Sequence, residues 1–162
     1  MRVLLGTLAL LAVAAPSARA GGSETRRCTA GIDAAVAPSR ARGDVIAGPL
    51  AFMGGPHLRA PSRIARTGVY AWKVPVLLQA GRSARVSVLP ADRASVGLSG
   101  ARQRTTVAAS RAAITFVGCA HARSGFGWSI LTKRKSLCLA LDVRSRGVTR
   151  RALLSLGTPG CP

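Results

Sequence analysis

Aromatic and acidic residues are scarce in this chain of 162 residues, and histidine occurs only twice. Aromatic residues make up 4% of the sequence, and five Asp and Glu residues stand against 24 Lys and Arg. The shortage of aromatics disfavours a site for single-stranded nucleic acid, which stacks bases on several aromatic side chains of one surface. Five scattered carboxylates give no reason to expect the carboxylate pair of a glycosidase or a Ca²⁺ site, which needs about six to eight oxygen ligands.

Motifs for metal, cofactor and nucleophilic chemistry are also missing. The sequence has no C-x-x-C and no G-x-S-x-G, and no phosphate-loop pattern follows the glycines of Ser124–Gly127. We therefore predict no metal, no cofactor and no catalytic residue. The only histidines, His57 and His121, lie in predicted loops and in no recognisable catalytic context. An exported hydrolase that uses His57 or His121 with a nearby acid or serine is kept as an alternative.

Long apolar runs are absent after the first fifteen residues. The run Val3–Ala15 follows a basic start and precedes Ala18 and Ala20, which form an A-x-A cleavage site. This pattern predicts a signal peptide over residues 1–20, because a run of 13 residues is short for a membrane-spanning helix, which needs roughly 20. We expect a secreted protein, extracellular or associated with the cell envelope, with no transmembrane segment in the mature chain.

Four cysteines, Cys28, Cys119, Cys138 and Cys161, provide two disulfides with three ways of pairing. Export permits disulfides, and the gaps of 91, 19 and 23 positions match no zinc-ligand spacing. We favour the pairs Cys119–Cys138 and Cys28–Cys161. In a plain up-and-down meander, however, Cys119 and Cys138 would lie roughly 10 Å or more apart, too far for a bridge. That pair therefore requires the loop 120–125 to run back along the sheet.

Short apolar runs separated by turn residues continue from Asp44 to the C-terminus, and several alternate with polar residues, as Leu137, Leu139 and Leu141 do. Nine such runs predict a single disulfide-stabilised, all-β sandwich of the immunoglobulin-like or Greek-key type over residues 44–162. Pro75 lacks an N–H, which places its strand at an edge or a bulge. Residues 21–43 are predicted to form an irregular Ala/Arg-rich arm. The nine runs are Val45–Phe52, Ala71–Gln79, Ala84–Leu89, Ser95–Leu98, Thr105–Ala109, Ala113–Val117, Phe126–Leu131, Leu137–Val143 and Val148–Leu156.

Positive charge is the one compositional excess. The formal net charge of +19 falls to about +17 without residues 1–20, and Arg outnumbers Lys by 21 to three. A high-GC genome produces such a composition without selection for ligand binding. The functional interpretation is that the positive charge attracts a polyanion. Lys133, Arg134 and Lys135 connect two strong strands, so we predict an exposed hairpin tip and candidate polyanion contacts there. The other basic clusters are Arg40/Arg42, Arg59/Arg63/Arg66, Arg102/Arg104 and Arg144/Arg146/Arg150/Arg151.

Seven segments from Asp44 onward carry a resemblance to known sequences: Gly48–Phe52, Lys73–Leu77, Ala84–Val88, Phe116–Cys119, Gly125-Phe126, Cys138–Val143 and Leu156–Cys161. In these segments, the chain resembles a group of exported β-sandwich proteins of unassigned function from high-GC, actinobacterial-type genomes. The resemblance implies an exported β domain held by disulfides, and it supplies no catalytic or ligand-binding residue.

The sequence thus predicts a non-enzymatic exported bacterial protein that acts as an interaction or structural module at the cell envelope. One alternative is a cationic domain that binds anionic wall polymer, and the other is the exported hydrolase. No dedicated nucleic-acid site is expected, and the oligomeric state is left open.

Overall fold

A computed structural model describes residues 21–28, 32–33, 36–54, 58–64, 66–100, 104–158 and 160–161, with the backbone alone for 32–33 and 62–63. The expected signal peptide, 1–20, lies outside the described residues. The strands are β1 (Ser23–Arg27), β2 (Ile32–Asp33), β3 (Val45–Ala47), β4 (Leu50–Phe52), β5 (Ser62–Ile64), β6 (Val69–Lys73), β7 (Val76–Leu78), β8 (Ser83–Val88), β9 (Val96–Ser99), β10 (Ala113–Val117), β11 (Ser124–Phe126), β12 (Ser129–Thr132), β13 (Leu137–Ser145) and β14 (Val148–Leu156). Among the described residues, the short 3-10 helices η2 (Arg40–Arg42) and η4 (Pro90–Asp92) occur in loops.

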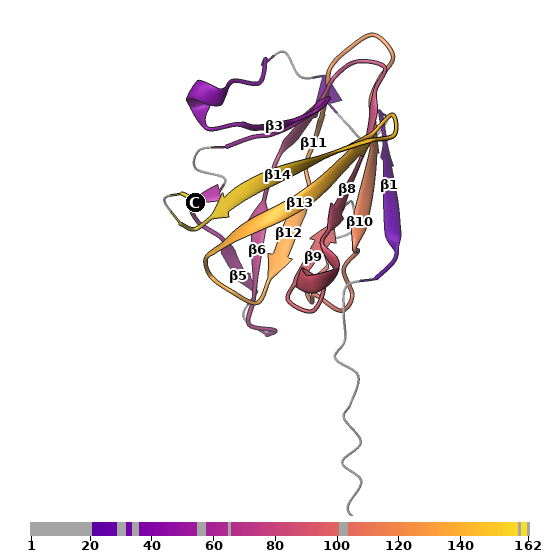
Figure 1. Ribbon diagram of the computed structural model, residues 1–162. Coiled ribbons are helices and arrows are strands. Elements are labelled where there is room, and N and C mark those ends of the chain that lie inside the picture. Colours follow the sequence, from indigo (N-terminus) through magenta and orange to yellow (C-terminus); the bar gives the residue numbers. More distant parts are fainter. Residues whose placement is uncertain are drawn as a thin grey trace, which may run out of the picture.

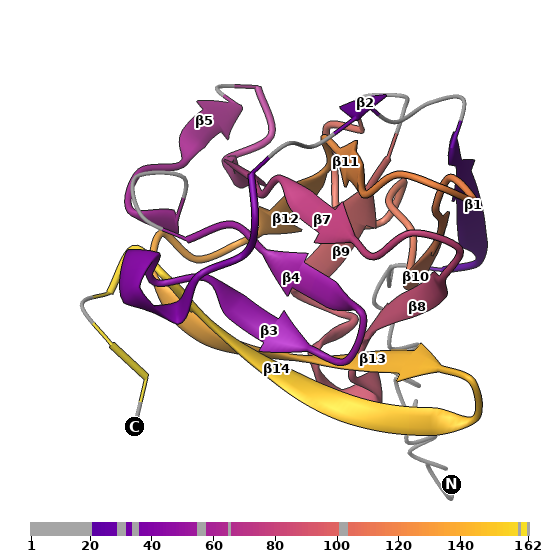
Figure 2. The same cartoon turned by 90° about the horizontal axis from the view of Figure 1, so that it is seen from above.

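The protein is all-β, as predicted, and its strands form three sheets. The first sheet has the order β1-β10-β8-β13-β14, the second β2-β11-β7-β4-β3 and the third β5-β6-β12-β9. The second and third sheets meet where β6 runs into β7 and β11 into β12, and the Val74 N–H donates to the Trp128 carbonyl between them (3.1 Å). Figures 1 and 2 show the long β13–β14 ribbon lying beside β3.

One hydrophobic core is shared by the three sheets, and its members come from alternate positions of the strands. The predicted inward faces are confirmed for Leu137–Val143, where residues 137, 139, 141 and 143 are buried. All three Phe and both Trp residues are buried, and Trp128 contacts both Phe52 and Phe116 with ring centroids 6.1 and 5.7 Å apart. The few aromatic residues are therefore used for packing.

Several predicted strands are divided or absent. Val45–Phe52 forms a hairpin whose two-residue turn is Gly48-Pro49, and Gly48 has the positive φ (62°) that such turns require. Pro75 interrupts Ala71–Gln79 between β6 and β7, but β7 pairs on both sides, so the expected edge position is wrong. Thr105–Ala109 forms turns rather than a strand.

The prediction of an irregular arm over residues 21–43 is wrong for its first residues. Ser23–Arg27 form β1, which pairs in parallel with β10 at the edge of the first sheet. The SETRR sequence of β1 has no apolar alternation, so its pattern does not predict a strand. Buried Arg26 donates from Nη1 to the Gly127 carbonyl (2.9 Å), which joins β1 to the connection between β11 and β12.

Both favoured disulfide pairs are wrong, although all four cysteines are bridged. The bonds are Cys28–Cys119 and Cys138–Cys161, with Cα atoms 4.9 and 5.4 Å apart. β10 and β13 both run antiparallel to β8, so they run parallel to each other. Cys119 follows the end of β10, whereas Cys138 lies near the start of β13. The register puts them at opposite ends of the sheet, about 33 Å apart along the strand direction. Cys28 follows β1, whose last residue pairs with Val117, so it meets Cys119.

Within the described ranges, no helix is long and apolar enough to cross a membrane.

Candidate functional site

The predicted contact residues Lys133, Arg134 and Lys135 are exposed, as expected. Their segment is not a hairpin tip, because it connects β12 of the third sheet to β13 of the first. Backbone groups hold the segment in place: the Lys133 N–H donates to the Ser95 carbonyl (3.1 Å), and the Thr132 hydroxyl donates to the Arg134 carbonyl (2.6 Å). We call residues 133–135 the lysine tip.

The hydrolase alternative requires a histidine in contact with a nucleophile or an acid. His121 is exposed in the bend between Cys119 and β11, and no hydrogen bond or ion pair joins it to another described residue. His57 lies outside the described residues. Among the residues that are placed, no group of three or more His, Cys, Asp or Glu could hold a metal ion.

The buried carboxylate of Asp44 stabilises a turn of the backbone. It accepts hydrogen bonds from the backbone N–H groups of Ser39 (2.8 Å) and Gly54 (3.0 Å), and Arg42 Nη2 lies 3.4 Å away. Burial alone would raise the pKa of Asp44, but these donors outweigh it and hold the pKa below its ordinary value of 3.8. Asp44 thus fixes the turn that contains η2.

The outer face of the first sheet carries two arginines side by side. Arg85 of β8 lies directly opposite Arg144 of β13 in the strand register, and threonines flank them on β10 and β14. Both arginines are exposed. Like charges at directly opposed positions, with Cβ atoms about 5 Å apart, destabilise a sheet slightly unless an anion lies between them.

Further arginines lie at the same end of this sheet, around the β13–β14 turn. Arg146 and Gly147 form a two-residue turn in which both φ angles are positive (49° and 80°), as in a type I′ hairpin. Arg150 pairs with Val143 in the register, and its side chain lies against Gly48, where an added Cβ would be 3.6 Å from Arg150 Cδ. The β13–β14 turn and the β3–β4 turn therefore face each other.

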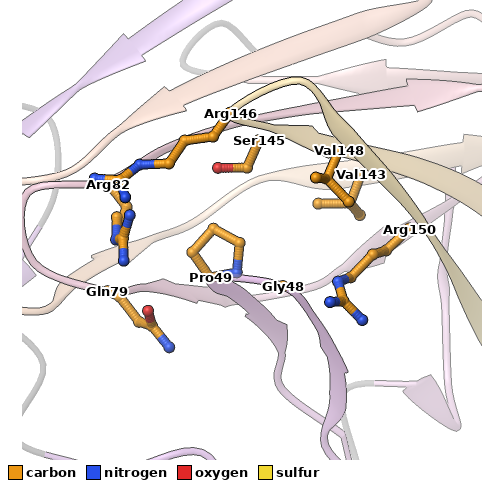
Figure 3. Close-up of a pocket in the computed structure, with 9 residues that line it drawn as sticks. All are labelled: Gly48, Pro49, Gln79, Arg82, Val143, Ser145, Arg146, Val148 and Arg150. Atoms are coloured by element: carbon orange, nitrogen blue, oxygen red, sulfur yellow. The ribbon is translucent and has the colours of Figure 1, made fainter.

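A hollow of about 340 Å³ lies between these turns. Figure 3 shows Arg82 and Arg146 toward one side of the hollow and Arg150 toward the other, with Pro49 between them. The described residues that line it are Gly48, Pro49, Gln79, Arg82, Val143, Ser145, Arg146, Val148 and Arg150.

Backbone hydrogen bonds fix the third wall of the hollow, the turn 79–82. The Gln79 N–H donates to the Pro49 carbonyl (3.1 Å), and the Gly118 N–H donates to the Arg82 carbonyl (2.9 Å). The Gly81 N–H donates to the carbonyl of Cys119 (2.7 Å), which is bonded to Cys28. The Cys28–Cys119 disulfide thus anchors the turn from which Arg82 extends.

We call Arg82, Arg85, Arg144, Arg146 and Arg150 together the arginine end. Within the part of the chain that the structure describes, none of their guanidinium groups has a hydrogen-bond or ion-pair partner. The nearby acid Asp142 is paired with Arg151 (3.2 Å). Arg82, Arg146 and Arg150 line the hollow, whereas Arg85 and Arg144 lie on the outer face of the same end of the sheet. Unneutralised guanidinium groups can bind an anion, because the planar group donates two parallel hydrogen bonds to carboxylate or phosphate.

The structure therefore places the strongest candidate site away from the lysine tip. The tip precedes β13, whereas the arginine end surrounds the last residues of β13, about 27 Å further along the strand. The sequence shows Arg144, Arg146 and Arg150 as one basic cluster. It gives no sign of Arg82 and Arg85, because they reach the cluster only through the pairing of β8 with β13.

Comparison with known proteins adds no relative: no family model, curated protein or solved structure matches this chain. The resemblance to exported actinobacterial-type proteins therefore stays a prediction.

Proposed function

We propose that this protein is an exported, non-enzymatic β domain that binds an anionic polymer of the cell envelope through its arginine end. The observation that carries the proposal is the convergence of five arginines without acidic partners in the described residues at one end of the first sheet. Three of these arginines line the hollow and two lie on the outer face of the sheet beside it, and such a concentration of one charge strengthens the local field and attracts polyanions.

Export is supported by the leader pattern of residues 1–20 and by the cysteines. All four cysteines form disulfides and none is free. Disulfides persist in oxidising compartments outside the cytosol. We also propose that the fold belongs to the Greek-key or immunoglobulin-like sandwiches, which the placement of β8 between the later strands β10 and β13 supports.

A polyol or sugar polymer is favoured over nucleic acid by the positions of the aromatic residues. Both Trp and all three Phe are buried, and Tyr70 is half-buried in β6. Single-stranded nucleic acid is bound by stacking bases on aromatic side chains, and these side chains are engaged in the core.

The test is retention of the secreted protein on immobilised heparin and on anionic cell-wall extract over a salt gradient. We compare two variants that each lose three positive charges: Arg85→Gln/Arg144→Gln/Arg150→Gln at the arginine end and Lys133→Gln/Arg134→Gln/Lys135→Gln at the lysine tip. The first variant should elute at clearly lower salt than the second, because each charge that contacts the polymer contributes to the salt dependence of binding.

Equal shifts in the two variants would show that net charge alone is responsible. Elution of the unmodified protein at low salt from both matrices would reject polymer binding.

A further inference from the structure

We propose that the hollow between the β13–β14 turn and the β3–β4 turn binds one phosphodiester unit of a polyol or sugar chain. This inference rests on the proposed function and names the ligand of the same site. The residues that would contact the phosphate are Arg82, Arg146 and Arg150.

The three guanidinium groups approach from different elements. Arg82 extends from the turn before β8, Arg146 from the β13–β14 turn and Arg150 from β14 itself (Figure 3). A phosphodiester has two charged oxygens and two ester oxygens arranged tetrahedrally about phosphorus, so it can accept from donors on several sides. A carboxylate offers two oxygens in one plane, so it satisfies fewer of these donors.

The backbone of Arg146 provides an independent observation. Arg146 is the one described non-glycine residue with a positive φ (49°), at a turn position where Asn, Asp or Gly is strongly preferred. A side chain kept in an unfavourable backbone conformation indicates a role for that side chain. Here the side chain lines the hollow, so its charge is the property that an Asn or Gly would not provide.

The size and the other walls of the hollow suit a phosphate attached to a carbon skeleton. A volume of about 340 Å³ exceeds what a phosphate alone requires and lies within the range of small-ligand pockets, about 300–1,000 Å³. Pro49, Val143 and Val148 supply apolar surface beside the charges. None of the described residues that line the hollow is aromatic, which favours a polyol or sugar over a stacked base.

The first experiment follows backbone amide signals by NMR at low salt and neutral pH while glycerophosphoglycerol is added, a phosphodiester with one negative charge. Glycerate, which also carries one negative charge, is the carboxylate control. We expect the amide signals of Gly48, Gln79 and Gly147 to shift with the phosphate and to saturate. Glycerate should bind about tenfold more weakly, because it can engage fewer guanidinium groups. Equal affinity for glycerate, or shifts spread evenly over all arginines, would overturn the phosphate site.

The second experiment uses variants matched in charge. Arg146→Gly suits the turn and should weaken binding of glycerophosphoglycerol about tenfold, since one charge-assisted contact is lost. Arg134→Gln removes the same charge at the lysine tip and should leave the affinity unchanged. If both variants weaken binding equally, the probe senses net charge and the site is rejected.

Two outcomes separate this inference from the proposed function. If glycerophosphoglycerol does not bind the hollow but retention on wall extract still requires the arginine end, the phosphate site is rejected and the proposed function stands. If neither binds, both are rejected. Vesicles of phosphatidylglycerol present the same phosphodiester on a membrane, and capture by these vesicles without binding to a soluble polyol-phosphate polymer would also overturn the inference.

Discussion

Both ends of the β13–β14 ribbon carry a basic cluster, but the two ends differ in shape. At one end, the lysine tip is exposed, and the C-terminal tail is bonded back to β13 through Cys138–Cys161. At the other end, the Arg146-Gly147 turn faces the β3–β4 turn across a hollow. Charges on an exposed loop are surrounded by water, whereas charges around a hollow act together on what enters it. A cluster of basic residues in a sequence therefore indicates a site only when the fold makes the surface concave around it.

The same ends differ in how tightly their glycines are packed. Gly157 follows β14 with φ 66°, and a Cβ there would be 2.7 Å from the Lys135 carbonyl oxygen and 2.8 Å from Trp72. Gly147 has φ 80°, and a Cβ there would meet no atom within 4 Å. We call the end that holds the lysine tip and Gly157 the pinned end. Its backbone is close-packed at Gly157, although a hollow of about 770 Å³ lies beside that residue, whereas the backbone of the arginine end is open at Gly147.

The largest expected effect comes from removing the disulfides pair by pair. Cys28→Ser/Cys119→Ser opens a loop with a separation of 91 residues and should lower the free energy of unfolding by up to about 4–5 kcal/mol. Cys138→Ser/Cys161→Ser opens a separation of 23 and should cost up to about 3–3.5 kcal/mol. Denaturant unfolding measures both.

The disulfide variants also sharpen the comparison between the ends. Only the first variant releases the turn 79–82, because Gly81 donates to the carbonyl of Cys119. It should therefore weaken polyanion retention under native conditions, whereas the second should not. A larger loss of retention in the Cys138/Cys161 variant would contradict the anchoring of Arg82 by Cys28–Cys119.

Alanine substitutions of the two glycines test the packing difference. Gly147→Ala should cost about 1–2 kcal/mol, the penalty of an L-residue in the left-handed region. Gly157→Ala should cost about 1–3 kcal/mol more than Gly147→Ala, because its methyl group meets the Lys135 carbonyl and Trp72. Equal free energies of unfolding for the two variants would show that the pinned end is not close-packed.

Acid should affect the molecule through Asp44, which lies away from the arginine end. Its pKa is lower in the folded protein than in the unfolded chain, so the unfolded state binds more protons in acid. Its contribution is present above about pH 5 and is lost as the pH falls through the lowered pKa. Asp44→Asn should cost about 1–3 kcal/mol at pH 7, since two backbone donors lose their charged acceptor. The deficit should shrink at pH 2–3, and a constant deficit would contradict the pKa shift.

The long strands could be predicted from the sequence because apolar and polar residues alternate along most of their length. Leu137–Val143 and Val148–Leu156 place an apolar residue at every second position over most of their length, and both form single strands, β13 and β14. Val45–Phe52 and Phe126–Leu131 are apolar runs whose sequence does not show where one strand ends and the next begins. Each contains a break, at Gly48-Pro49 and at Gly127-Trp128, that becomes visible only in the pairing.

The disulfide pairs and the arginine end could not be predicted because both depend on register between distant segments. β1 has a polar sequence and is held by pairing with β10, and without β1 the position of Cys28 cannot be deduced. In the same way, Arg85 reaches Arg144 only because β8 pairs with β13. Local patterns identify faces of strands, but contacts between strands decide which cysteines and which charges meet.

The smallest expected effect on stability is that of Arg146→Gly. Whether the variant gains or loses stability shows whether Arg146 is kept for its charge or for its packing. Glycine relieves the left-handed conformation of residue 146, a gain of about 1–2 kcal/mol, but it increases the entropy of the unfolded chain, which offsets about 0.4–1 kcal/mol. The variant should therefore be as stable as the natural chain or more stable by about 1 kcal/mol, measured by denaturant unfolding. If it is also weaker in phosphate binding, the arginine is kept at the turn for its charge. A clear loss of stability would instead assign Arg146 a packing role and remove the backbone argument for the phosphate site.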